Sequence, residues 1–149
     1  MLWVAIPAVA LDRLTKRWSL SLEGVREAVP GILNFNPVAN AGAAFGALSG
    51  KTGLLVALTL VLCAAVVFCL FRFAHMPRLA RAGLWLVVAG GLSNLFDRLL
   101  YGHVIDFLEF DFVRFAVFNV ADVCIVLGCA MAFVALLRAE GRGGHGGTI

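Results

Sequence analysis

The sequence has little charge, and this shortage limits its broad class. Only 14% of its 149 residues are charged and 62% are hydrophobic, and the mean hydropathy is +0.97. A soluble globule of this length cannot bury so much apolar surface. Residues 53–73 contain one charged side chain, Arg72 at the carboxyl end, and residues 115–137 contain only Asp122. Each run is long enough to cross a hydrocarbon core about 30 Å thick, so we predict a membrane protein.

Other scarcities argue against several kinds of site. The four cysteines lie in apolar runs without C-x-x-C spacing, which disfavours disulfides and zinc. Of the three histidines only His103 lies near the acidic residues, so no serine–histidine nucleophile is indicated. No basic run with interleaved aromatic residues points to nucleic acid. We expect no metal and no cofactor, with a metal site of His103, Asp106 and Asp122 as the alternative.

We predict four membrane-spanning helices, at about residues 1–18, 53–73, 82–101 and 117–138. The third span is short, but Arg81 can snorkel at its end. The first span has an alternative, because Ala8-Val9-Ala10 imitates a signal-peptide cleavage site. Against cleavage, no Lys or Arg precedes Arg13, whereas a signal peptide begins with a basic region. Residues 1–139 are expected to form one membrane-embedded domain, followed by a flexible, glycine-rich cytoplasmic tail at 140–149.

Two segments outside the spans, residues 19–52 and 102–116, are predicted to contain short strands. Residues 32–35 and their neighbours have strand character between glycines and prolines, and residues 108–114 alternate in part with period two. Four spans put both segments on one side, so they are expected to pair at the membrane surface. The predicted fold class is therefore an all-α membrane protein with four transmembrane helices and a small β-sheet.

The distribution of lysine and arginine leaves the orientation of the chain undecided. Arg72, Arg78 and Arg81 form a compact cluster without acidic residues between the second and third spans. We place this cluster in the cytoplasm, although the positive-inside rule gives this placement only weak support.

Ionisable residues gather at the span ends on one side. Such residues in or beside membrane spans are costly and mark candidate functional sites. The group consists of Asp12, Lys16, Asp97, Arg98, Asp106 and Asp122. Asp12 and Lys16 have the i, i+4 spacing of a helical ion pair. We interpret the neighbours Asp97 and Arg98 as an ion pair or an interfacial anchor.

Asp106 and Asp122 are predicted to meet. Residues 119–122 resemble a capping box, with Asn119 as the N-cap and Asp122 one turn inside the helix. A turn at Gly102 and His103 would fold the chain back over the end of the third span. Two carboxylates in one site cannot both ionise cheaply, so one holds a proton while the other acts as a base. Such a pair can activate water to hydrolyse an amide.

Two other classes of function compete with hydrolysis. A small four-span transporter or proton relay would use the paired carboxylates to bind a cation. A non-catalytic scaffold would use Gly42 and Gly46 as a small-xxx-small helix contact. A transporter or proton relay would require an acidic residue near the middle of the membrane, and residues 53–73 contain no acidic residue.

Five motifs together resemble those of the bacterial lipoprotein signal peptidases, signal peptidase II. They are DRLTK at 12–16, NAGAAF at 40–45, NLFDR at 94–98, GHVIDF at 102–107 and FNVAD at 118–122, in the order of the family. The resemblance implies an aspartic endopeptidase of the bacterial cytoplasmic (inner) membrane with both termini in the cytoplasm. It also implies an extracytoplasmic sheet that cradles the substrate, a diacylglyceryl-modified prolipoprotein cut just before its lipidated cysteine.

The resemblance also implies roles for individual residues. Asp106 and Asp122 match the catalytic pair of the family. The positions implied to bind substrate or support the site are Asp12, Lys16, Asn40, Gly42, Asn94, Arg98, Asn119 and Ala121. Ser93 stands where a glycine is common, and the chain begins unusually close to its first span. The expected partners are the prolipoprotein and membrane phospholipid, and the enzyme is expected to be a monomer.

A run of phenylalanines precedes Asp122. Its members are Phe107, Phe110, Phe112, Phe115 and Phe118. We expect either an apolar wall for lipid or signal sequence or ordinary interfacial packing.

Overall fold

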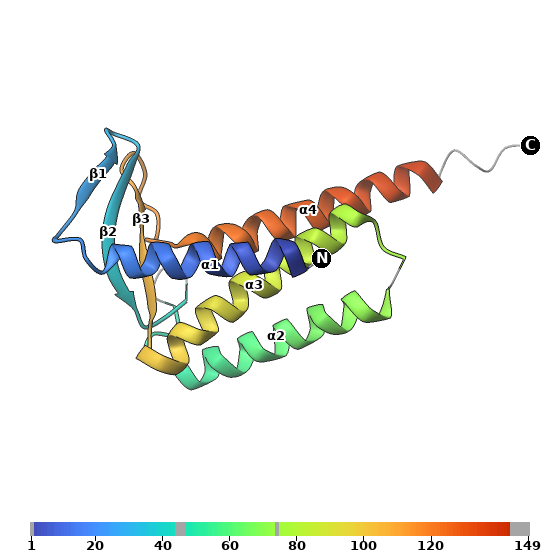
Figure 1. Ribbon diagram of the computed structural model, residues 1–149, viewed down its shortest axis with the longest axis horizontal. Coiled ribbons are helices and arrows are strands. Elements are labelled where there is room, and N and C mark those ends of the chain that lie inside the picture. Colours follow the sequence, from blue (N-terminus) through green and yellow to red (C-terminus); the bar gives the residue numbers. More distant parts are fainter. Residues whose placement is uncertain (1, 44–46, 74, 144–149) are drawn as a thin grey trace, which may run out of the picture.

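The computed structural model describes residues 2–43, 47–73 and 75–143. Four long helices form a bundle, and a small sheet lies across one end of it (Figure 1). The helices are α1 (Leu2–Ser19), α2 (Thr52–Arg72), α3 (Arg78–Tyr101) and α4 (Val120–Gly143). The antiparallel strands β1 (Arg26–Val29), β2 (Leu33–Asn40) and β3 (Val104–Phe110) follow the order β1-β2-β3. The helix count and the small sheet agree with the predicted fold.

Within the part of the chain that the structure describes, three helices are long and apolar enough to cross a membrane. They are α2, α3 and the part Val120–Ala139 of α4. They correspond to the second, third and fourth predicted spans, although α3 begins earlier, at Arg78, and α4 begins at Val120. α1 carries Asp12, Arg13, Lys16 and Arg17, which explains why its composition differs from that of the other three.

α3 is the central helix and contacts α1, α2 and α4. Its contact with α4 depends on glycines: a Cβ at Gly83 would collide with the carbonyl oxygen of Gly128, and one at Gly90 with that of Ala121. Small residues at such positions let two helix backbones touch. The first turn of α4 is therefore pressed against α3, despite the serine at position 93.

The predicted pairing of the two extramembrane segments is confirmed, because β2 pairs with β3 from Leu33 and Phe110 to Asn40 and Val104. The strand predicted at 108–114 was misplaced, since β3 occupies Val104–Phe110. The chain turns directly after α3 at Gly102, whose φ of +77° suits glycine. The first four residues of β3 are all buried, so this half of the strand shows no alternation of polar and apolar residues.

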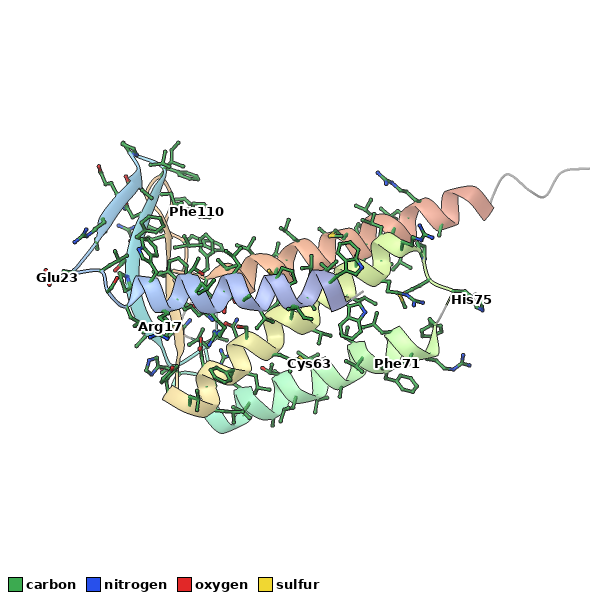
Figure 2. All side chains as sticks on the ribbon, viewed as in Figure 1. Arg17, Glu23, Cys63, Phe71, His75 and Phe110 are labelled. Atoms are coloured by element: carbon green, nitrogen blue, oxygen red, sulfur yellow. The ribbon has the colours of Figure 1, made fainter. Side chains whose placement is uncertain are left out.

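The sheet is attached to the end of α1 through aromatic contacts. The Trp18 ring lies roughly perpendicular to the rings of Phe35 and Phe107, with centroid distances of 4.8 Å and 6.4 Å. Figure 2 shows Glu23 at the sheet end of the molecule and His75 at the opposite end, between α2 and α3. At the other terminus α4 continues to Gly143, and residues 144–149 of the predicted tail lie outside the described residues.

Candidate active site

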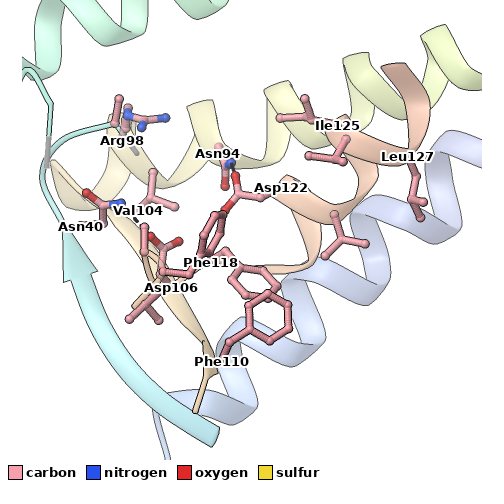
Figure 3. Close-up of a pocket in the computed structure, with 16 residues that line it drawn as sticks. Asn40, Asn94, Arg98, Val104, Asp106, Phe110, Phe118, Asp122, Ile125 and Leu127 are labelled. Carbon is pink, nitrogen blue, oxygen red and sulfur yellow. Dashed lines mark hydrogen bonds between the residues drawn. The ribbon is translucent and has the colours of Figure 1, made fainter. Parts of the chain in front are cut away.

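A cavity of about 470 Å³ lies where β3 meets the beginning of α4, and both predicted carboxylates line it (Figure 3). Its polar end contains Asn40, Asn94, Arg98, Asp106 and Asp122. The remaining wall is apolar and includes Phe110, Phe115 and Phe118 together with Ile125, Val126 and Leu127 of α4. The cavity therefore combines a small set of ionisable groups with a long apolar surface, which is typical of a ligand site.

Asp122 is fixed by the predicted capping box. Its backbone amide donates to Oδ1 of Asn119 over 2.9 Å, and the backbone amide of Asn119 donates to Oδ2 of Asp122 over 3.1 Å. Each side chain thus accepts a hydrogen bond from the backbone N–H of the other residue. Oδ1 of Asp122 additionally accepts a 2.8 Å hydrogen bond from the side-chain amide of Asn94.

Asp106 lies on β3 and is 2% exposed. Its Oδ2 accepts a 2.7 Å hydrogen bond from Asn40, and its Oδ1 accepts a 2.6 Å bond from Asn119. Burial raises the pKa of Asp106 from 3.8 to about 6; the bond from Asn40 opposes this shift, and the charge of Asp122 adds to it. Near pH 6 this carboxyl is therefore poised between its protonated and ionised forms.

The asparagines Asn94 and Asn119 connect the two carboxylates. The Asn119 side-chain amide donates to Asp106 and also, over 3.1 Å, to Oδ1 of Asn94. Asn94 in turn donates to Asp122 and accepts a 2.8 Å bond from the Lys16 ammonium. Asn119 is fully buried and Asn94 is 7% exposed, so water competes little with these bonds.

A buried charge cluster lies behind the asparagines. Lys16 Nζ is 3.0 Å from Asp12 and 2.8 Å from Asp97, and the Arg13 guanidinium contacts the same two carboxylates. The i, i+4 pair of Asp12 and Lys16 is therefore confirmed. The interpretation of Asp97 and Arg98 as an ion pair was wrong, because consecutive residues of a helix do not face each other and Asp97 turns toward α1.

Arg98 instead supports the segment that follows β2. Its guanidinium donates to the carbonyl of Gly42 over 3.0 Å, and the Gly42 amide donates to Oδ1 of Asn40 over 2.9 Å. Both Arg98 and Asn40 line the cavity, so these bonds shape its rim.

Sequence reasoning assigned no site role to Arg13 or Ser93. Arg13 donates to Asp12 over 2.8 Å and also pairs with Asp97, while the Ser93 hydroxyl donates to Asp12 over 2.6 Å. A count of charges could have indicated Arg13, because two carboxylates behind the site need a second cation besides Lys16. Spacing could have indicated Ser93, which lies one turn before Asp97 on α3.

The outer edge of β3 is occupied at two points. The amides of Phe107 and Leu108 donate to the Phe118 carbonyl over 3.0 and 2.8 Å, and Phe118 donates back to Leu108 over 2.9 Å. Nearer Asp106, the Ile105 amide donates to Asp97 over 3.4 Å, and the Ile105 carbonyl accepts from Asn119 over the same distance.

The phenylalanines divide between two surroundings. Phe110, Phe115 and Phe118 line the cavity, whereas Phe107 packs against Trp18 and Phe35 on the sheet. Phe112 is exposed and belongs to a second hollow beside β3. The expected apolar wall thus consists of three of the five rings.

Two other expectations concern ligating side chains. Among the described residues no three His, Cys, Asp or Glu side chains come together in a group that could hold a metal ion, and His103 lies beside Tyr101. The four cysteines are free thiols. Of the glycines in the scaffold alternative, Gly46 lies outside the described residues.

The chain is similar over nearly its whole length to known bacterial proteins. A family model described as Signal peptidase (SPase) II matches residues 4–138. The chain is 37% identical over 145 residues to a lipoprotein signal peptidase of Clostridium novyi, an alignment that covers 93% of this chain and 97% of the relative. It is 34% identical over 146 residues to a lipoprotein signal peptidase of Streptococcus agalactiae, and this alignment covers 95% of this chain and 94% of the relative.

Solved structures agree with this similarity. The chain superposes with a TM-score of 0.88 at 29% identity on a structure named "Bacterial membrane enzyme structure by the in meso method at 2.3 A resolution", covering 95% of this chain and 89% of the other. A second structure of a bacterial membrane enzyme, at 1.9 Å resolution, superposes with a TM-score of 0.82 at 30% identity, and the alignment covers 91% of each chain. The chain is a multi-pass membrane protein, and it belongs to the signal peptidase II family of lipoprotein-processing aspartic peptidases.

Proposed function

We propose that Asp106 and Asp122 are the catalytic pair with which this signal peptidase cleaves a diacylglyceryl-modified prolipoprotein just before its lipidated cysteine. One observation carries the proposal: the two carboxylates come from separate elements and line one cavity, where shared asparagines hold them. The apolar wall beside them suits acyl chains or a signal sequence.

The pair hydrolyses the amide through one bound water. Asp106 holds the shared proton, in keeping with its raised pKa, and Asp122 is the base. Asp122 takes a proton from the water as its oxygen adds to the amide carbon, and Asp106 protonates the carbonyl oxygen. When the C–N bond breaks, Asp122 gives its proton to the leaving amine, and the hydroxyl of the intermediate returns a proton to Asp106.

Asparagine substitutions test the pair. We expect Asp106→Asn and Asp122→Asn each to lower the cleavage rate by about 10²- to 10⁴-fold, because asparagine keeps the shape of the side chain and removes its proton transfer. The matched control is Asp111→Asn, which changes an exposed carboxylate just beyond β3 that contacts Asn34.

Mass spectrometry of the products identifies the cut bond, and thermal unfolding in detergent verifies that each variant folds. A variant of Asp106 or Asp122 with full activity contradicts the dyad. A folded wild type that does not cut contradicts the whole proposal and leaves cation binding by the pair to be tested.

We further propose that the sheet and the pair lie on the extracytoplasmic side of the inner membrane. α1 then spans the membrane as well, both termini lie in the cytoplasm, and the enzyme works as a monomer surrounded by phospholipid. Glu23 and His75 are exposed and lie at opposite ends of the molecule (Figure 2). In a background without the four native cysteines, Glu23→Cys in intact cells with a permeable outer membrane should react with a charged maleimide, and His75→Cys should not. The reverse labelling contradicts the orientation.

A further inference from the structure

Ala121, which immediately precedes Asp122, is held at both ends of its backbone. Its N–H donates to Oδ1 of Asp12 over 2.8 Å. Its carbonyl oxygen lies so close to Gly90 of α3 that a Cβ there would collide with it. The first N–H groups of a helix have no partner within the helix. Asp12 of α1 therefore supplies the partner of an amide next to the proposed base.

The position of the Asp12 carboxylate depends in turn on Ser93. The Ser93 hydroxyl donates to Oδ2 of Asp12 over 2.6 Å, and Asp12 and Ser93 are 1% and 2% exposed. Arg13 and Lys16 also contact this oxygen, but both belong to α1, as Asp12 does. Ser93 belongs to α3, one turn beyond Gly90, and so links Asp12 to the helix against which Ala121 packs.

We propose that Ser93 is a positioning residue for Asp122, which acts through Asp12 and the Ala121 amide. The inference rests on the proposed catalytic role of Asp122. Ser93 is absent from the lining of the cavity, so its effect on the reaction passes through the placement of the first turn of α4. Proton transfer requires the reacting groups to be held to within about 0.5 Å of their working positions.

Without the Ser93 hydroxyl, Oδ2 of Asp12 is contacted, among the described residues, only by the long side chains of Arg13 and Lys16, which belong to the same helix. The carboxylate then has no direct bond to α3 and is connected to it only through Arg13 and Lys16, which both contact Asp97. Its bond to Ala121 becomes longer or less well aligned. Because the cavity wall is unchanged, substrate binding persists while the transition state loses stabilisation, which lowers kcat more than it changes KM.

The experiment compares Ser93→Ala and Ser93→Gly with the full-length wild type in lipid nanodiscs, with a diacylglyceryl-modified prolipoprotein as substrate. We expect kcat to fall by about 3- to 30-fold while KM stays within about twofold. Amide hydrogen exchange of a peptide covering residues 119–123 should become faster. The two variants differ in volume but both lack the hydroxyl, so equal losses assign the effect to the hydrogen bond.

Ser19→Ala is the matched control. Ser19 is fully buried, and its hydroxyl donates over 2.8 Å to the Lys16 carbonyl within α1. We expect this variant to keep the kcat of the wild type.

Wild-type kcat in both Ser93 variants, or an equal loss in Ser19→Ala, overturns the positioning role while the proposed function stands. A wild type that does not cleave overturns the proposed function and the positioning role together, and this is seen before any variant is made. If Ser93→Ala does not fold, Ser93→Gly provides the same measurements.

Discussion

The Lys16 ammonium donates to Oδ1 of Asn94 over 2.8 Å in the interior of the protein. Lysine offers only donors, so the Asn94 amide must present its oxygen to Lys16. Its NH₂ group is thereby directed to Asp122, to which it donates over 2.8 Å. A cation of α1 thus determines which atom of α3 faces a carboxylate of α4.

Replacement of Lys16 should therefore damage stability and activity together. Lys16→Met leaves Asp12 and Asp97 buried with Arg13 as their remaining cation, and loss of one partner from a buried ion pair costs about 3–5 kcal/mol. The midpoint of thermal unfolding in detergent should fall steeply. The matched control is Lys51→Met, which removes an exposed lysine before α2 and should leave the midpoint unchanged. Equal midpoints for the two variants would show that the cluster tolerates the loss.

Asn119 should be sensitive for a different reason. Asn119→Ala removes the cap of α4 and the hydrogen bonds to Asp106 and Asn94 in one step. The cap alone contributes about 1 kcal/mol of stability. We expect the cleavage rate to fall by about 10²-fold or more, because the Asp106 carboxylate loses a partner and Asn94, which donates to Asp122, loses the bond from Asn119. Asn36→Ala, which removes a 2.9 Å bond to Glu109 on the sheet, should cleave normally. A rate for Asn119→Ala within threefold of wild type, roughly the loss of one weak hydrogen bond, would contradict this expectation.

The raised pKa of Asp106 predicts how stability depends on pH. The folded protein holds this proton up to about pH 6, whereas the unfolded chain releases it near 3.8. The contribution of Asp106 to stability is therefore greatest below pH 3.8 and is lost as the pH rises to about 6. As the pH rises from 3.8 to about 6, the stability of Asp106→Asn should therefore increase relative to that of wild type by on the order of 3 kcal/mol. Unfolding midpoints of the two proteins at pH 4 and pH 7 provide the measurement, and a constant difference between them contradicts the shift.

Glycine substitutions should separate close packing from helix propensity. Gly90→Ala places a methyl group against the Ala121 carbonyl, which is backbone and cannot move aside cheaply, so we expect a loss of about 1–3 kcal/mol. Gly53→Ala in α2 meets open space, and alanine favours the helix by up to about 1 kcal/mol. Thermal unfolding should therefore move in opposite directions in the two variants. A stabilised Gly90→Ala would refute the close contact between α3 and α4.

The helices were largely predictable because each of the later three has a long apolar run. α2 is the simplest case, since no charged side chain interrupts its apolar run from Gly53 to Phe71. The capping box was predictable for a similar reason, because Asn119 and Asp122 interact within one turn of the chain. Local sequence thus determines these features directly.

Contacts between distant residues were harder to predict. Arg13 and Asp97 are separated by 84 positions, and the adjacent Arg98 looked like the better partner until the direction of each side chain on α3 was known. The bonds through Asn94 and Asn119 likewise join α3, α4 and β3, so no local pattern specifies them. The resemblance indicated these asparagines, and the structure supplies the bonds that each of them makes.

The occupied outer edge of β3 restricts how a peptide can approach Asp106. Phe118 covers the edge at Leu108, and Asp97 and Asn119 occupy the backbone groups of Ile105. A substrate therefore cannot extend the sheet as an added strand beside Asp106 unless these bonds break. If Asp106 belongs to the catalytic pair, as proposed, the scissile amide has to reach the face of β3 from the cavity, and groups outside the sheet have to recognise the substrate backbone.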